Sequence, residues 1–135
     1  MFKINSSLHY MKSTSAGGEE AHAAETRWTP NTDVYLTDDG LVIKVELAGI
    51  RREDLEITVE ATRLTISGQR PDCCRASKCR FVMMEINYGH FETSIEVPPG
   101  HDLDKARASY QNGFLRVDVP QAGAPKNVTV LTAKE

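Results

Sequence analysis

The chain lacks any long run of apolar residues. Its uninterrupted apolar stretches are only a few residues long, whereas a helix that spans a bilayer needs about 20. Residues 1–10 also lack the continuous apolar segment of a secretory signal, because polar side chains separate Phe2, Ile4 and Leu8. These absences argue against a helical membrane protein. We therefore expect a cytoplasmic protein with no membrane partner.

Cysteine is scarce and unevenly placed. The chain has 3 cysteines, Cys73, Cys74 and Cys79, all within one short polar stretch. An odd and crowded set is a poor disulfide framework in a reducing compartment. A zinc site with His90 as a further ligand is the alternative, but structural zinc sites need four ligands and usually C-x2-C spacing. We favour free thiols in a loop and expect no metal and no other cofactor.

The sequence has no basic region that would suit nucleic acid. The net charge is −3, and residues 31–120 carry 11 basic and 15 acidic side chains, so we expect no nucleic-acid partner. One local group of basic residues does stand out, namely Arg70, Arg75, Lys78 and Arg80. The stretch that follows, residues 81–104, has no lysine or arginine. We interpret this group as a solvated loop, with electrostatic steering between subunits as the alternative.

Motifs for catalysis and nucleotide binding are missing as well. The sequence contains no G-x-x-x-x-G-K-[ST], no G-x-G-x-x-G and no G-x-S-x-G. The acidic residues Asp38 and Asp39, and likewise Asp102 and Asp104, stand next to glycine-containing turns. That position favours a turn role for them over acid–base catalysis or calcium binding. We expect a protein that is not an enzyme.

The sequence does have a hydrophobic period of two over most of its length. Apolar residues alternate in short β-rich runs separated by turn signals such as Asp38-Asp39-Gly40 and Asn112-Gly113. The runs cover residues 33–37, 41–47, 55–59, 64–66, 80–88, 91–97 and 114–119. Seven or eight short strands without a convincing amphipathic helix predict an all-β sandwich.

The run over residues 80–88 differs from the others because it is apolar on both of its alternating faces. Such a strand must be covered on two sides. One small sandwich cannot cover both faces, so this run predicts contact with a second chain.

The two ends of the chain have a different composition from the middle. Residues 12–26 are small and polar, which predicts a flexible tether, and the tip before it is apolar. We divide the chain into a flexible N-terminal arm (1–27), a folded domain (28–120) and a C-terminal extension (121–135). The tip carries Phe2, Ile4, Leu8, Tyr10 and Met11, and the extension has a small apolar island at Val128 and Val130.

Residues 108–120, ASYQNGFLRVDVP, resemble the signature of the small heat-shock proteins, the alpha-crystallin domain family. The matching positions are Ala108, Gly113 and Leu115, followed by a strand that closes in Pro120. Other matching segments fall in the family's order and spacing, so the resemblance covers residues 30–120; they include 33–35, 47–50, 53–55, 64–68, 88–91 and 97–98. The Val128-x-Val130 pair resembles the family's I-x-I tail motif.

The resemblance implies an immunoglobulin-like β-sandwich that works as an ATP-independent chaperone, or holdase, for partly unfolded proteins. It also implies a strand-swapped homodimer that assembles into larger oligomers, with clients bound by the apolar tip of the arm. The dimer interface would comprise Val34, Tyr35, Leu36, Phe81, Val82, Met83, Met84 and Ile86. The Val128 and Val130 tail of a neighbouring dimer would dock in a groove lined by Leu55, Ile57, Val59, Ala106 and Ala108.

The sequence departs from the family pattern at two positions. Thr93 stands where the family usually has an arginine that forms ion pairs between subunits. Phe114 replaces the usual valine, from which we expect a slightly repacked core. The alternative function is a monomeric β-sandwich binding module, either a p23-like co-chaperone domain or a carbohydrate-binding domain. Such a module would run near 15 kDa in size-exclusion chromatography.

Overall fold

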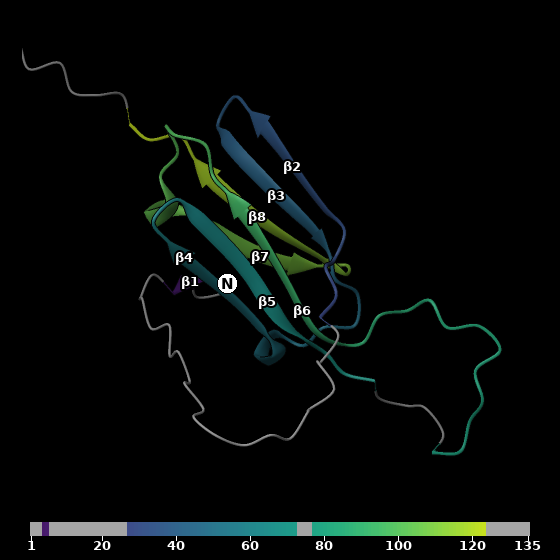
Figure 1. Cartoon of the computed structure of the whole chain (residues 1–135). Helices are drawn as coiled ribbons and strands as arrows, with labels where there is room; N and C mark the ends of the chain where they lie inside the picture. The colour runs from purple at the N-terminus through teal and green to yellow at the C-terminus, as the bar shows by residue number, and fades with distance from the viewer. Residues whose placement is uncertain (1–3, 6–26, 73–76, 124–135) are drawn as a thin grey trace, which may run out of the picture.

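Short strands build two four-stranded β-sheets in the computed structural model, which describes residues 4–5, 27–72 and 77–123 (Figure 1). One sheet has the order β1-β4-β5-β6, with β1 at Ile4–Asn5, β4 at Leu55–Glu60, β5 at Arg63–Arg70 and β6 at Gly89–Glu96. The other has the order β2-β3-β8-β7, with β2 at Thr32–Thr37, β3 at Gly40–Glu46, β8 at Phe114–Pro120 and β7 at Arg107–Gln111. The predicted all-β sandwich is confirmed.

Among the described residues, helical structure consists of two short 3-10 turns. These are η1 (Arg52–Asp54), which leads into β4, and η2 (Leu103–Lys105), which leads into β7. In the parts of the chain that the structure describes, neither turn nor any other helix is long and apolar enough to cross a membrane.

The core lies between the two sheets because alternate residues of each strand point inward. Its largest side chains are almost completely removed from solvent, and each contributes roughly 1.5–3 kcal/mol to the free energy of unfolding. They comprise Ile43 and Val45 of β3, Leu115, Val117 and Val119 of β8, Leu64 and Ile66 of β5, Ile57 of β4, Phe91 of β6, and Leu47 after β3. No polar residue is buried among the described residues.

The Asn112-Gly113 turn sets the register of the β7–β8 hairpin. Both residues have a positive φ, 54° for Asn112 and 80° for Gly113, as the hairpin turns that match strand twist require. The turn pairs Ala108 with Val117 and so directs both side chains into the core. The hairpin expected from the sequence is confirmed.

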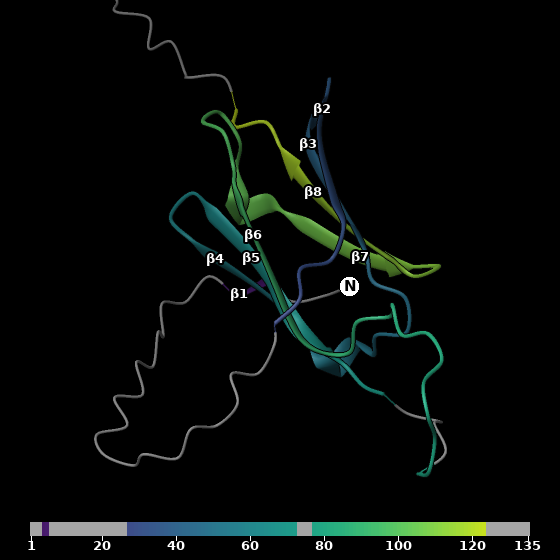
Figure 2. The same ribbon diagram turned by 45° about the vertical axis from the view of Figure 1, so that its right-hand side comes forward.

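The strand expected over residues 80–88 does not form within one chain, and its exchange onto a second chain stays a prediction. These residues have no strand assignment, and the segment extends away from the sandwich in both views (Figures 1 and 2). A strand needs a neighbouring strand to receive its backbone hydrogen bonds, and no strand of the described residues pairs with this segment.

Phe114 does not repack the core, contrary to expectation. Leu115, the next residue of β8, points inward, so Phe114 points outward and its side chain is 41% exposed. The Lys44 ammonium lies 4.4 Å from the centre of its ring, a cation–π contact worth about 0.5–1 kcal/mol at an exposed site.

The close approach of β5 to η1 makes Gly68 a sensitive position. A Cβ atom there would overlap the carbonyl oxygen of Asp54 and come within 2.8 Å of Cζ of Phe91. We predict that Gly68→Ala lowers the free energy of unfolding by about 2–3 kcal/mol, measured by urea denaturation. Gly123→Ala is the control, because a Cβ there meets nothing within 4 Å; equal stability of the two variants would contradict the packing described.

Candidate functional site

Most of the exposed large apolar side chains of the described residues lie in two places, the edge of β2 and the segment between β5 and β6. Val82 is fully exposed and Leu36 is 67% exposed. The described residues have nine exposed large apolar side chains, and eight of them belong to the predicted dimer interface. These eight are Val34, Tyr35, Leu36, Phe81, Val82, Met83, Met84 and Ile86, and the ninth is Phe114. Residues 77–88, all of them exposed except the half-buried Tyr88, are called the apolar loop below.

The β2 strand lies at the end of its sheet and pairs only with β3 within the described residues. Its outer edge therefore offers unpaired backbone donors and acceptors. Val34 and Leu36 pair across the strands with the core residues Ile43 and Leu41 of β3. Tyr35, between them, points to the other face of the sheet. The β2 edge is thus apolar on both faces.

The far edge of the same sheet is different in character. The outward-facing side chains of β7 are polar or charged, namely Arg107, Ser109 and Gln111. Polar and charged residues on an edge strand discourage pairing with another chain. Of the two edges of this sheet, β2 is therefore the one suited to accept a further apolar strand.

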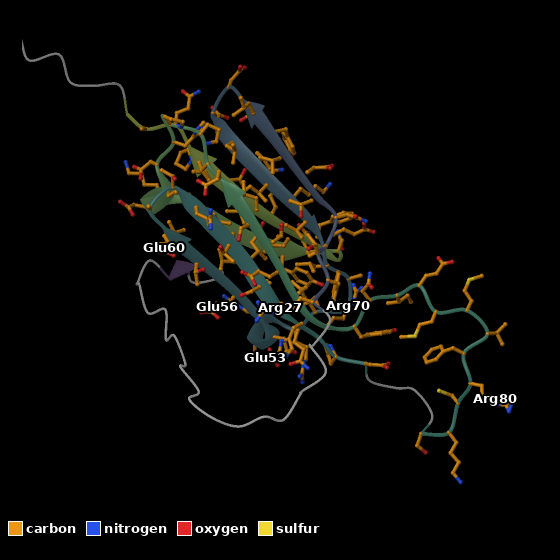
Figure 3. All side chains as sticks on the ribbon, viewed as in Figure 1. Arg27, Glu53, Glu56, Glu60, Arg70 and Arg80 are labelled. Carbon is orange, nitrogen blue, oxygen red and sulfur yellow. The ribbon has the colours of Figure 1, made fainter. Side chains whose placement is uncertain are left out.

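The ends of the apolar loop are held at one corner of the sandwich. Arg70, the last residue of β5, pairs with Gly89, the first residue of β6. The Arg70 side chain donates one hydrogen bond to the carbonyl oxygen of Asn87 at 2.8 Å and one to that of Ala48 at 3.2 Å. The interpretation of Arg70 as part of a solvated loop was therefore wrong. Figure 3 shows Arg70 at the sandwich, whereas Arg80 lies far out on the loop.

The predicted tail-binding groove is narrower than the sequence suggested. Ile57 and Ala108 are buried in the core, at 1% and 3% exposure, because inward-facing residues of β4 and β7 pack between the sheets. The other three residues, Leu55, Val59 and Ala106, are half-buried against the margin of the core. Of the five residues predicted for the groove, only these three have partly exposed side chains.

The N-terminal arm supplies a strand that sequence analysis missed. The β1 backbone runs parallel to β4, with Ile4 opposite Ile57 and Asn5 opposite Thr58. Two residues are too short to give a readable β pattern, which is why the sequence carries no signal for it. The remaining predicted arm residues (Phe2, Leu8, Tyr10 and Met11) and the tail residues Val128 and Val130 lie outside the described residues.

The outer face beside β4 is acidic. Glu53 on η1 and Glu56 and Glu60 on β4 are exposed and are labelled in Figure 3. On the neighbouring strands, Arg63 donates a 2.8 Å hydrogen bond to Glu96, which holds the pKa of that carboxyl below its ordinary value. Both side chains of this pair are more than half exposed, so the pair adds little to stability.

The signature residues have structural roles, and the acidic turns behave as expected. Ala108 and Leu115 are core residues, and Gly113 forms the turn between their strands. The side chain of Asp102 accepts a hydrogen bond from the backbone N–H of Asp104 at 3.1 Å, which is the turn role predicted for it. Thr93 is half-buried on the inner side of β6.

The described residues contain no cluster of three or more His, Cys, Asp or Glu side chains that could hold a metal ion. Cys79 is an exposed free thiol, while Cys73 and Cys74 lie outside the described residues. The candidate site is thus an exposed apolar surface beside an open strand edge, β2.

A sandwich with this topology and these signature residues can be compared with known families. The sequence profile described as "Hsp20/alpha crystallin family" matches residues 33–131. The chain belongs to this family. Membership supports a chaperone role in general, in a family of chaperones and not of enzymes.

Relatives and solved structures agree with the family assignment. Small heat shock protein C2 of Rickettsia felis is 33% identical over 73% of this chain and 64% of its own length. The 17.8 kDa class I heat shock protein of Solanum lycopersicum is 33% identical over 81% of this chain and 69% of its own length. A small heat-shock protein from Xylella fastidiosa has a TM-score of 0.71, with 25% identity over 81% of this chain and all of that one.

The cysteines provide a test of the chemistry assigned to this region. Because Cys79 is an exposed thiol, we predict that changing Cys73, Cys74 and Cys79 together to Ser leaves the thermal midpoint within about 2 °C, since exposed substitutions usually change stability by less than 0.5 kcal/mol. Differential scanning calorimetry and metal analysis of the purified protein check this. One zinc ion per chain that disappears in the triple variant, with a lower midpoint, would contradict it.

Proposed function

We propose that this protein is an ATP-independent holdase, which binds partly unfolded proteins under stress and prevents their aggregation. The observation that carries the proposal is the match of the Hsp20/alpha crystallin family profile over residues 33–131. The lack of a nucleotide-binding motif in the sequence supports a role without ATP, and we expect the protein to act in the cytoplasm. The exposed apolar side chains on β2 and on the apolar loop support self-association, because a contiguous apolar surface marks an interaction site in a soluble protein.

We further propose that two copies pair by exchanging the apolar loop. The loop of one chain would form a strand along the outer edge of β2 in the other, which would satisfy the unpaired backbone groups of both. Burial of Val82, Met84 and Ile86 against the partner would contribute roughly 1.5–3 kcal/mol for each side chain before the cost of ordering the loop. The second loop of a symmetric pair doubles that gain.

Dimers would assemble further through the C-terminal extension. Val128 and Val130 are two residues apart, so on an extended tail they project to the same side. Leu55, Val59 and Ala106 are the half-buried residues of the predicted groove and would contact these valines. The extension carries Lys126 and Lys134 against one acidic residue, Glu135, which complements the glutamates beside β4. The related Xylella fastidiosa protein forms a high order structure.

The apolar tip of the arm, with Phe2, Ile4, Leu8, Tyr10 and Met11, would bind clients in this proposal. The pairing of Ile4 and Asn5 with β4 spans only two residues. A contact of that size is weak, so the tip is available to exchange between β4 and an unfolded protein.

The holdase activity is tested by light scattering of a heat-labile client. We expect one chain of the protein per client to reduce aggregation severalfold in buffer treated with apyrase to remove ATP. The control is an equal mass of an inert globular protein. No suppression, or suppression that requires ATP, would refute the proposed activity.

The exchanged dimer is tested by placing charge on the apolar loop. We predict that Val82→Asp with Met84→Asp converts the protein to 15 kDa monomers in analytical sedimentation, because burying a carboxylate in the interface costs several kcal/mol. Ser77→Asp with Cys79→Asp adds the same charge to exposed residues of the same loop and should leave the dimer intact. A wild-type protein that is itself monomeric would favour the binding-module alternative.

The role of the tail is tested by removing its two valine side chains. Val128→Ala with Val130→Ala should shift the sedimenting species from larger oligomers to dimers, because each tail contact is weak and acts only with several others. Thr129→Ala is the matched control, since its side chain projects to the opposite side of an extended tail. If the double variant keeps the full oligomer, the tail does not link the dimers.

A further inference from the structure

The corner at which the apolar loop leaves the sandwich has a dense set of contacts around Arg70. Its guanidinium carbon lies 4.3 Å from the centre of the Trp28 ring and 5.9 Å from that of Tyr88. Its nitrogens donate to the carbonyl oxygens of Asn87 and Ala48. One side chain thus contacts the domain's first residues, the turn after β3 and the end of the apolar loop.

Trp28 is itself fixed to the strand that follows the loop. Its backbone N–H donates to the carbonyl oxygen of His90 at 3.1 Å, and its carbonyl oxygen accepts from Glu92 at 3.2 Å. Its indole N–H donates to the carbonyl oxygen of Gly89 at 3.2 Å, and its ring packs against Phe91 with the ring centres 5.3 Å apart. The Trp28 ring is therefore a rigid platform beside the start of β6.

The geometry of these contacts allows Arg70 to fix the position of the end of the apolar loop. A planar guanidinium can donate to two carbonyl oxygens while it stacks on an aromatic ring, so Arg70 sets the path of Asn87 and Tyr88 relative to the sandwich. The loop is apolar and exposed only a few residues earlier, from Phe81 to Ile86. Small changes at this corner would be magnified along the extended loop.

We propose that Arg70 and Trp28 form a clamp that fixes the direction in which the apolar loop leaves the sandwich and so presents it to a second copy of the chain. Arg70 is then a positioning residue for dimer formation, and not part of the contact surface. Because Trp28 is also the point at which the N-terminal arm joins the domain, the clamp links the arm to the same corner. The effect on dimers rests on the proposed function, whereas the clamp itself can be measured in a single chain.

The clamp has two readouts that do not depend on dimer formation. Trp28 is the only tryptophan, so quenching of the protein's tryptophan fluorescence by iodide reports how accessible the Trp28 ring is to solvent. We expect Arg70→Ala to raise the quenching constant at least twofold and to speed hydrogen exchange of peptides covering residues 86–90 at least tenfold, with less than a threefold change in β3 and β8. Unchanged quenching and exchange would overturn the clamp whether or not the wild-type protein dimerises.

The effect on assembly is measured by sedimentation over a dilution series. Arg70→Ala should raise the dimer dissociation constant at least tenfold. Arg63→Ala is the matched control, because Arg63 begins the same strand and its hydrogen bond to Glu96 is exposed and remote from the loop. Equal dissociation constants for the two variants would overturn the positioning role. A monomeric wild type would instead refute the proposed dimer.

A conservative variant keeps the test valid if Arg70→Ala fails to fold. Arg70→Lys keeps the positive charge but offers a single nitrogen in place of the planar fork. We expect amide hydrogen exchange over residues 86–90 to be at least threefold faster in this variant than in the wild type. Its dimer dissociation constant should lie between those of the wild type and Arg70→Ala. If Arg70→Lys is indistinguishable from the wild type in both measurements, the planar guanidinium of Arg70 has no positioning role.

Discussion

The open outer edge of β2 is the constraint on which the rest of the structure depends. A sheet edge with unpaired backbone groups and apolar side chains on both faces tends to associate with another strand, and no described strand other than β3 pairs with β2. The same chain also holds an apolar segment that forms no strand within the described residues. The two features complement each other, because the outer edge of β2 has no pairing strand and residues 80–88 have a strand-like sequence but no sheet edge to pair with.

The sandwich supports this arrangement by holding both features rigidly. The core between the sheets fixes β3, on which β2 rests, and it fixes β5 and β6, between which the apolar loop emerges. The corner at Arg70 and Trp28 then connects the loop to this rigid body through polar and aromatic contacts instead of further core packing. The domain is thus a rigid scaffold with exposed apolar side chains on β2 and on the apolar loop, which is the arrangement that the proposed self-association requires.

The sequence predicted those features that depend on local pattern. Alternating apolar residues located the strands, and Asn112-Gly113 located a hairpin, because both signals act over a few residues. Features that depend on distant residues were missed or misjudged: Arg70 looked solvated because Trp28 reaches it only in the fold. The strand over residues 80–88 stays a prediction, because its proposed pairing strand belongs to a second chain. Ile57 and Ala108 were assigned to a groove because a sequence does not show how far the second sheet covers them.

The exchange of the apolar loop onto β2 is tested most directly by cross-linking between two differently tagged chains in which Cys73, Cys74 and Cys79 are serine. One chain carries Leu36→Cys, and the other carries Cys in place of Val82, Met84 or Ile86 in turn. Our account predicts that at least one of the three pairs forms a mixed disulfide in high yield after oxidation, while an Arg63→Cys chain mixed with the same partners does not. Mixed disulfides no more abundant than with Arg63→Cys, for all three positions, would contradict the account.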